Sequence, residues 1–195
     1  DAGTQLLCLL AFYKTLKRYP RGCVGIAQMR QFHRGRYTFV HSLTREAMRW
    51  MHMCAAGHHE EGKAMLVDTA ASVANCFRSA REGEDFFATL FAMANFQVYG
   101  SLSGNALASS LNLTLGKFLP GVFEVASPEL LLSNMSMGAD ITHIAGVNMR
   151  QDGASMCYKV FPDRIRIEIF WNFRKPHALL PIMESLNESG DLLKG

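Results

Sequence analysis

Histidine and carboxylate side chains gather at one place in this sequence, the run His58-His59-Glu60-Glu61. Residues three apart can share a helix face, and imidazole and carboxylate groups are ligands that zinc accepts. The neighbouring sequence contains no second cluster of such residues. The run is therefore more typical of the polar first turn of a helix than of a metal site, and we expect no bound metal.

Two further histidines, His33 and His41, could each act as a general base. Neither has a neighbouring carboxylate in the sequence that would orient its imidazole, so a packing or hydrogen-bonding role is favoured for both. The sequence contains no GxSxG, P-loop or GxGxxG motif. Residue types and spacing alone thus predict an α/β domain without assigning a reaction to it.

The first half of the chain has mainly the 3.6-residue period of helices. Residues 4–19 form a predicted helix with one narrow polar face, and a second helix begins at Thr44, whose side chain suits an N-cap. Between them, residues 23–26 form a short apolar strand or extended segment. A helical block at 63–99 follows, and Gly83 is expected to divide it in two.

The period then changes to the two-residue alternation of strands. Strands are predicted for residues 130–136, 141–147, 154–161 and 164–173. The last two pair as a hairpin around Pro162-Asp163. A final helix follows at 179–186, with Pro176 or Pro181 in its first turn. Helices followed by an antiparallel sheet under a helix predict an α/β sandwich, or half of one.

Composition narrows the class of protein. The 195 residues are 49% apolar, which is enough for a sizeable core, and the net charge of +3 is too small to indicate nucleic acid binding or a membrane surface. No apolar run reaches the roughly 20 residues of a membrane span. Five cysteines without a CxxC pair favour reduced thiols and a cytoplasmic location. The chain begins at Asp1, and we expect it to be an internal piece of a longer polypeptide.

Several short segments match known sequence motifs, and they occur in the same order as those motifs. Near the start, Asp1-Ala2, Gln5-Leu6 and Ala11-Phe12-Tyr13 follow P-D-A-x-x-Q-x-A-x-x-x-A-Y-Y, Gln31 to Arg36 follows R-x-F-x-x-G-R-T, and Ser42 to Trp50 follows S-x-x-x-E-A-x-x-W. Later, Gly83 to Phe86, Ser133 to Ser136 and Asp152 to Tyr158 follow G-x-x-x-D-R-H, S-T-S and D-G-Y-G-I-C-Y. Almost end to end, the chain resembles the C-terminal portion of the choline/carnitine O-acyltransferase family. It is most similar to the carnitine acyltransferase-like release domain of a fungal polyketide synthase.

The resemblance implies an α/β fold in two lobes, the CoA-dependent acyltransferase (chloramphenicol acetyltransferase-like) fold. Residues 1–195 would be its C-terminal lobe, with 1–126 mainly helical and 127–195 a small mixed or antiparallel sheet plus the final helix. The catalytic lobe, with the histidine that deprotonates the acceptor hydroxyl, would lie upstream, outside this chain. Ser136 would support the oxyanion, while Asn134 replaces the first serine of the S-T-S segment.

Some residues differ from the family pattern at the positions that bind carnitine, and these differences indicate which acceptor alcohol can bind. Val24, Tyr37 and Ala88 stand where the family binds the carnitine carboxylate with tyrosine, threonine and arginine, and alanine cannot replace a bidentate arginine. Ala145 and Gly146 stand where an aromatic ring faces the trimethylammonium group, so the cation–π partner is also missing. Carnitine is thus not the expected acceptor, and choline is disfavoured as well. Tyr37 is expected to report which alcohol is accepted.

The resemblance therefore predicts acyl transfer from a thioester to another alcohol, as in polyketide release onto a polyol. The donor would be CoA or the phosphopantetheine of an acyl carrier protein, with no resident cofactor, and the partners would be the upstream lobe, that donor and a small-molecule alcohol. One alternative is a non-catalytic pseudoenzyme lobe or a module that docks a carrier protein through Lys14, Arg18, Arg30 and Arg36. The other is a true carnitine or choline acyltransferase in which Arg30 or Arg36 binds the carboxylate.

Overall fold

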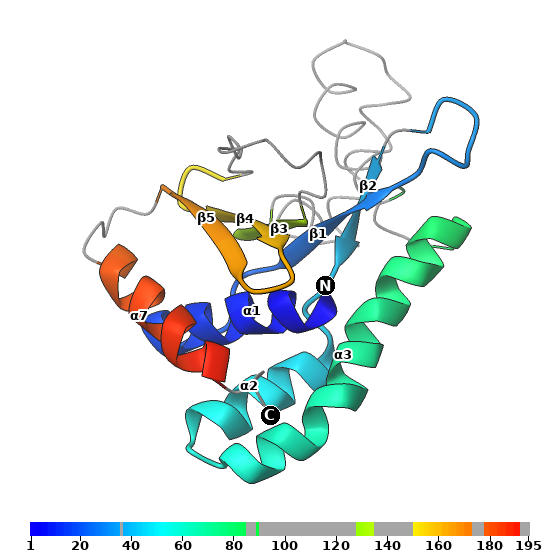
Figure 1. Ribbon diagram of the computed structural model, residues 1–195. Coiled ribbons are helices and arrows are strands. Elements are labelled where there is room, and N and C mark those ends of the chain that lie inside the picture. The colour runs from blue at the N-terminus through cyan, green and yellow to red at the C-terminus, as the bar shows by residue number, and fades with distance from the viewer. Residues whose placement is uncertain (36, 85–88, 90–127, 135–149, 173–177, 192–195) are drawn as a thin grey trace, which may run out of the picture.

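A computed structural model describes residues 1–35, 37–84, 89, 128–134, 150–172 and 178–191. These residues form four helices and one five-stranded sheet (Figure 1). The helices are α1 (Ala2–Leu16), α2 (Arg45–Ala55), α3 (His59–Glu82) and α7 (Leu179–Gly190). The strands are β1 (Cys23–Gln28), β2 (Tyr37–His41), β3 (Leu130–Asn134), β4 (Ala154–Val160) and β5 (Ile165–Trp171). The predicted α/β class is confirmed at this level.

The sheet is mixed, with strand order β2-β1-β3-β4-β5. β3 is parallel to both β1 and β4, while β2 is antiparallel to β1 and β5 is antiparallel to β4. The predicted hairpin of β4 and β5 is confirmed. The strand or extended segment predicted at 23–26 is confirmed as β1. The antiparallel sheet expected to follow the helices is wrong, because β3 pairs in parallel with both β1 and β4, which gives the mixed form that the resemblance also allowed. β2 was not predicted. β1 also occupies a central position, between β2 and β3.

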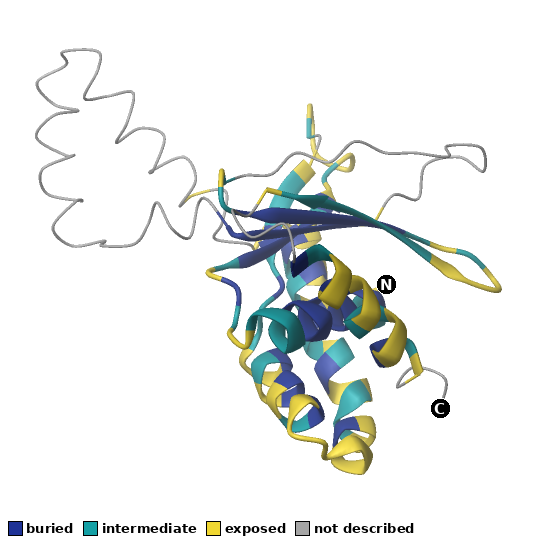
Figure 2. Ribbon diagram, turned by 90° about the vertical axis from the view of Figure 1, so that its left-hand side faces the viewer, coloured by how far each residue is buried: buried dark blue, intermediate teal, exposed yellow. Residues whose placement is uncertain are grey.

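In the described part of the chain, the helices all lie on one side of the sheet (Figure 2). α1 is the innermost, and nine consecutive residues from Thr4 to Phe12 are buried. This burial agrees with the single narrow polar face predicted for the helix. α1 ends three residues earlier than predicted because Lys17 turns to φ 54° and donates its backbone N–H to the Tyr13 carbonyl.

α2 and α3 pack against each other as an antiparallel pair. Thr44 caps α2 as predicted, since its Oγ1 accepts a hydrogen bond from the Ala47 N–H at 3.1 Å. The Trp50 Nε1–H donates to the Gly62 carbonyl at 2.9 Å, and a Cβ on Gly62 would lie 2.6 Å from the Cys54 sulfur. The glycine therefore allows the two helices to approach closely.

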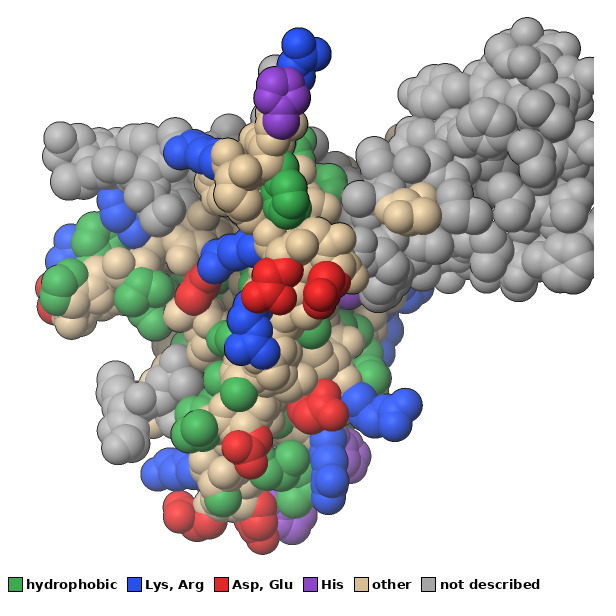
Figure 3. All heavy atoms as spheres, turned by 90° about the vertical axis from the view of Figure 1, so that its right-hand side faces the viewer, with side chains coloured by type: hydrophobic (Ala, Val, Ile, Leu, Met, Phe, Trp, Pro, Cys, Tyr) green, Lys and Arg blue, Asp and Glu red, His purple; other side chains and the backbone are tan. Residues whose placement is uncertain are grey.

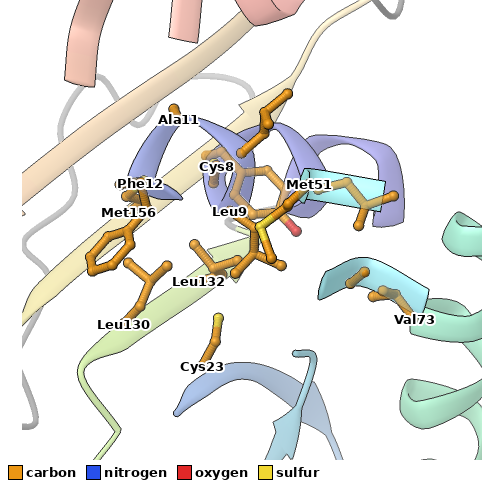
Figure 4. Packing of buried hydrophobic residues seen from close by; sticks show 14 of the residues in the cluster. Cys8, Leu9, Ala11, Phe12, Cys23, Met51, Val73, Leu130, Leu132 and Met156 are labelled. Atoms are coloured by element: carbon orange, nitrogen blue, oxygen red, sulfur yellow. The ribbon is translucent and has the colours of Figure 1, made fainter. Parts of the chain in front are cut away.

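The core lies between the helices and the sheet, where α1, α2, β3 and β4 meet (Figure 4). Its largest fully buried side chains are Trp50, Tyr158, Phe12, Leu6, Leu9, Leu10, Met51, Leu130, Leu132, Met156 and Ile182. α3 ends at Gly83, which has φ 85°, as the predicted division required. The predicted strand at 141–147 and the second half of the helical block lie outside the described residues.

Candidate functional site

The sheet presents a second face, opposite to the helices, and this face carries the candidate site. Successive side chains of a strand point to opposite faces, so β1 sends Cys23 and Ala27 to the helical core and Val24 and Ile26 to the second face. Val24 and Leu131 form a separate apolar cluster there with Ile26 and Phe39. The second face is thus built from β1, β2 and β3 around an apolar centre.

Val24, the first predicted substrate-binding residue, lies in this centre with an exposed fraction of 0%. Its register partners are His41 on β2 and Leu131 on β3. A buried aliphatic side chain between these neighbours offers no hydrogen bond to a carboxylate, and burying a carboxylate without a partner is costly. This part of the face is suited to apolar contact.

Tyr37, the second predicted residue, begins β2 and is 58% exposed. Its strand parity matches Phe39, so it belongs to the second face, and its ring packs edge-on against the Phe39 ring with centroids 5.6 Å apart. Tyr37 pairs with Gln28, however, whereas Val24 lies four residues earlier in β1. The two residues therefore share a face but are separated by about 13 Å along the strand.

Asn134, the third predicted residue, is the exposed last residue of β3. By alternation it shares the face of Leu132, which packs in the helical core, and so it does not face Val24. Ser133 has the parity of Leu131, belongs to the second face and is 5% exposed. The sequence contains Ser133 in the segment that resembles S-T-S, but its orientation depends on which side of β3 the helices cover. The other predicted residues, Ser136, Ala88, Ala145 and Gly146, lie outside the described residues.

A polar row crosses three strands of the second face at Ser133. In register, Ser133 pairs with Cys157 on β4, and Cys157 pairs with Glu168 on β5. Burial raises the pKa of the Cys157 thiol, and the Glu168 carboxylate raises it further. The thiol therefore stays neutral, so the row offers hydrogen-bonding groups rather than a thiolate nucleophile.

The carboxyl ends of the three parallel strands meet at one edge of the sheet. Gln28, Asn134 and Val160 end β1, β3 and β4 there, and Tyr37 joins them as the register partner of Gln28. Open α/β sheets bind ligands at the carboxyl ends of their parallel strands. The apolar centre, the polar row and this carboxyl edge together form the candidate site.

The model of the choline/carnitine O-acyltransferase family matches residues 1–180. The chain belongs to this family. Membership implies acyl transfer to a hydroxyl group, and it confirms the family that the order of motifs indicated. None of the curated proteins compared with the chain matches it.

An acyltransferase of this family must hold its strands in register, and an ionic network does so at the amino end of β3. The Glu129 side chain is fully buried and accepts hydrogen bonds from both terminal nitrogens of Arg18, at 2.7 and 2.5 Å, and from the Arg21 backbone N–H at 2.7 Å. Arg21 also pairs with Asp152 at 2.6 Å. Burial opposes ionisation of Glu129, but these bonds outweigh it, and its pKa is lowered.

This network was missed by sequence reasoning, which treated Arg18 as part of a solvated basic face. It joins the end of α1 to the start of β3 and, through Asp152, to the turn before β4. Gly153 allows the close fit, because a Cβ there would lie 2.9 Å from the Glu129 carbonyl oxygen. These contacts link residues more than a hundred positions apart, so no local pattern could have indicated them.

Acyl transfer needs a general base. The described histidines were predicted to have structural roles, and none of them is assigned as that base. His33 is exposed in the loop between β1 and β2, and His41 lies beside Val24 on the second face. His58 lies 3.8 Å from Glu61, its partner at i+3. Among the described residues, no group of three potential metal ligands comes together. None of the helices described here is long and apolar enough to cross a bilayer.

Proposed function

We propose that this chain is the C-terminal lobe of an O-acyltransferase that moves an acyl group from a thioester to an alcohol other than carnitine. The whole enzyme would have the two-lobe chloramphenicol acetyltransferase-like fold. Its other lobe, upstream of these residues, would supply the catalytic histidine. Family membership over residues 1–180 supports the reaction class.

The environment of Val24 is the observation that favours a different acceptor. The family resemblance places the carnitine carboxylate against Val24 and Tyr37, yet Val24 is fully buried among apolar side chains. Tyr37 offers only a phenol and lies about 13 Å along the strand from Val24. A carboxylate needs a cation or several N–H donors when it leaves water, and neither position supplies them.

The acceptor is proposed to be a polyol, and the reaction the release of a polyketide by transesterification. Tyr37 and Gln28 place a phenol and an amide on the second face at the carboxyl edge. Such groups can each donate and accept hydrogen bonds, which suits an uncharged acceptor with several hydroxyl groups.

In the proposed reaction, a histidine of the other lobe removes the proton of the acceptor hydroxyl. The oxygen attacks the thioester carbonyl, and a serine hydroxyl, that of Ser133 in β3 or that of Ser136 in the sequence segment that resembles S-T-S, stabilises the tetrahedral oxyanion. The carbon–sulfur bond then breaks, and the thiolate receives the proton from the imidazolium. The products are an ester and the free thiol of CoA or of a carrier protein.

An acyl-transfer assay on the complete protein tests this function, with carnitine, choline and a series of polyols as acceptors and one acyl thioester as donor. We expect ester formation with a polyol and none with carnitine or choline. Efficient transfer to carnitine would overturn the proposed acceptor. Absence of ester with every acceptor and several donors would favour a non-catalytic lobe instead.

A further inference from the structure

A cleft of about 760 Å³ opens between the β4–β5 hairpin and α7. This volume lies within the range of about 300–1,000 Å³ that small-molecule sites occupy. The cleft lies on the helical side of the sheet, because Ile167 and Ile169 of β5, which line it, also pack against the helical core. The sheet therefore separates this cleft from the candidate site on the second face.

β5 supplies one wall of the cleft through the alternation of its side chains. Ile165, Ile167 and Ile169 all point to this side and line the cleft. The hairpin extends beyond the layer of helices (Figure 2), which leaves the apolar face of its outer end partly exposed. Ile165 is 39% exposed there, and its register partner Val160 on β4 is 49% exposed.

α7 supplies the opposite wall with one of its faces. Leu179, Met183, Leu186 and Gly190 line the cleft at spacings of three and four residues, which places them along one side of the helix. α7 packs along α1, and the buried Leu7 of α1 contributes to the floor between the two walls. Met183 is 49% exposed, and its flexible thioether side chain can adapt to the shape of a ligand.

The polar groups that line the cleft gather at one end of it, where the hairpin turns. Asp163 and Arg164 belong to the turn itself, and Asn187 belongs to the last turn of α7. α7 follows β5 in the chain and runs back, so its last turn lies nearer the hairpin turn than its first turn does (Figure 1, Figure 2). The cleft is therefore elongated, about 16 Å from Leu179 to Gly190 along the helix, with an apolar interior and one polar end.

Two cations lie at this polar end. The Lys159 Nζ is 5.2 Å and the Arg164 guanidinium carbon 4.7 Å from the centroid of the Phe161 ring, which lines the cleft. Arg164 pairs with Asp163 at 2.9 Å, but both side chains are mostly exposed and the guanidinium keeps further N–H donors. Figure 3 shows this end of the hairpin at the left of the view, where hydrophobic side chains lie beside charged ones. The polar end is thus suited to a single negative charge.

The shape of the cleft favours one slender apolar chain over a partner helix or a membrane. A helix with its side chains is about 10 Å across, so a length of 16 Å has a volume of roughly 1,200 Å³, and the cleft could enclose only part of it. Membrane-binding segments direct their apolar side chains outward into the lipid. Here the isoleucines of β5 and the apolar face of α7 line a concave space instead.

We propose that the cleft between the β4–β5 hairpin and α7 binds a fatty acid, with its alkyl chain between β5 and α7 and its carboxylate beside Lys159 and Arg164. Burial of the chain supplies most of the affinity. The charge-assisted contact to the guanidinium fixes the direction in which the chain lies. The proposal does not depend on acyl transfer, because the cleft and the candidate site lie on opposite faces of the sheet.

The test is the binding of decanoate to the complete protein, measured by isothermal titration calorimetry below the concentration at which decanoate forms micelles. The variant Ile165→Gln/Met183→Gln makes both rims of the cleft polar. The matched control Val67→Gln/Leu180→Gln changes two exposed apolar residues that do not line the cleft. We expect the Kd to rise about tenfold in the cleft variant and to stay within about twofold of the wild type in the control. No binding by the wild type, or the same Kd in all three proteins, would overturn the proposal.

Decanol tests the head group, because it has the same chain without the charge. It should bind the wild type about fivefold more weakly than decanoate, and Arg164→Gln, a substitution at the surface, should reduce that difference. Equal binding of the acid and the alcohol to the wild type would overturn the assignment of a fatty acid.

Two further results would place a different occupant in the cleft or the ligand elsewhere. A wild-type dimer that Ile165→Gln/Met183→Gln dissociates in sedimentation would show that a second copy fills the cleft, and would overturn the proposal. Decanoate that a saturating acyl thioester displaces would be bound at the reaction site, which would overturn it too. Binding is measured without turnover, so a failure of the proposed acyl transfer leaves this result unchanged, and the reverse also holds.

Discussion

The two edges of the sheet use the same residue type in opposite ways. At the amino edge, where the parallel strands β1, β3 and β4 begin, Arg18 donates two hydrogen bonds to the buried Glu129 carboxylate. The Arg21 backbone N–H donates a third to the same carboxylate. At the carboxyl edge, Arg30 and Arg34 are exposed in a loop and form no ion pair with a described residue. β1 connects the two edges and is only six residues long.

The difference shows that one strongly basic segment supplies both arginines that pair with a buried carboxylate and arginines that stay exposed. Arginines at the amino edge neutralise a carboxylate that would otherwise be buried without a partner, which is where ionic contacts have large energetic consequences. Exposed charges contribute little to stability, so those of the carboxyl edge are available for recognition. The same comparison predicts which substitutions unfold the protein and which change only its reactions.

The largest expected effect on stability comes from Glu129→Gln. The substitution removes the negative charge that accepts three hydrogen bonds from Arg18 and Arg21. The arginine side chains left behind are 43% and 46% exposed and stay hydrated, so the loss should be about 2–3 kcal/mol, the size of a hydrogen bond to a charged group. Urea denaturation should show this loss in the free energy of unfolding. Asp163→Asn, which removes an exposed pair with Arg164, is the control and should cost less than about 1 kcal/mol. Equal effects of the two substitutions would refute the distinction between buried and exposed pairs.

Acidification should remove the same contribution in the wild-type protein. The pKa values of Glu129 and Asp152 are lowered in the folded state. Their stabilisation is therefore complete above the unfolded pKa, about 4, and is lost as the pH falls through the lower folded values. Unfolding measured between pH 7 and pH 2 should show a steep acid limb that is shallower in Glu129→Gln. An identical acid limb in the variant would assign the effect to other carboxylates.

Gly153→Ala should have an intermediate effect. The new Cβ would lie 2.9 Å from the Glu129 carbonyl oxygen, which belongs to the backbone and cannot rotate away. Overpacking of this kind typically costs about 1–3 kcal/mol. Gly190→Ala, where a Cβ would meet no atom within 4 Å, provides the control. Thermal unfolding should separate the two variants, and a Gly153→Ala protein as stable as the wild type would show that β3 and β4 can shift apart.

Substitution of the carboxyl-edge arginines should have the smallest effect on stability. Arg30→Ala/Arg34→Ala should change the free energy of unfolding by less than about 0.5 kcal/mol, as for other surface positions. Arg34 has a left-handed backbone with φ 56°, but relief of strain is not expected, because alanine at position 34 has the same backbone restriction as arginine. A loss of several kcal/mol would mean that this loop, like the amino edge, holds the fold together.

The sequence predicted those elements whose signals are local. The N-cap at Thr44, the break at Gly83 and the alternation in β4 and β5 each lie within a few residues, and each is confirmed. β2 was missed because it is a half-exposed edge strand of five residues, so its alternation is hidden in a basic and aromatic run. Its pairing with β1 depends on contacts outside either segment.

The candidate site was predicted less completely, for reasons of geometry. Val24 and Tyr37 do share a face, but their distance along β1 follows from a register that only the hairpin sets. Ser133 and Asn134 are neighbours in the sequence and face opposite sides, so choosing between them requires knowing which side the helices cover. The role of Glu129 depends on arginines more than a hundred residues away.

The most direct test of the proposed acceptor is to compare Tyr37→Thr with the wild type in the complete protein, using carnitine and a series of polyols. Tyr37 is 58% exposed, so the variant should fold with nearly unchanged stability. We expect wild-type transfer to a polyol and a changed order of preference among acceptors in the variant. Wild-type transfer to carnitine, or an order of preference that Tyr37→Thr leaves unaltered, would contradict the assignment of this edge to acceptor binding.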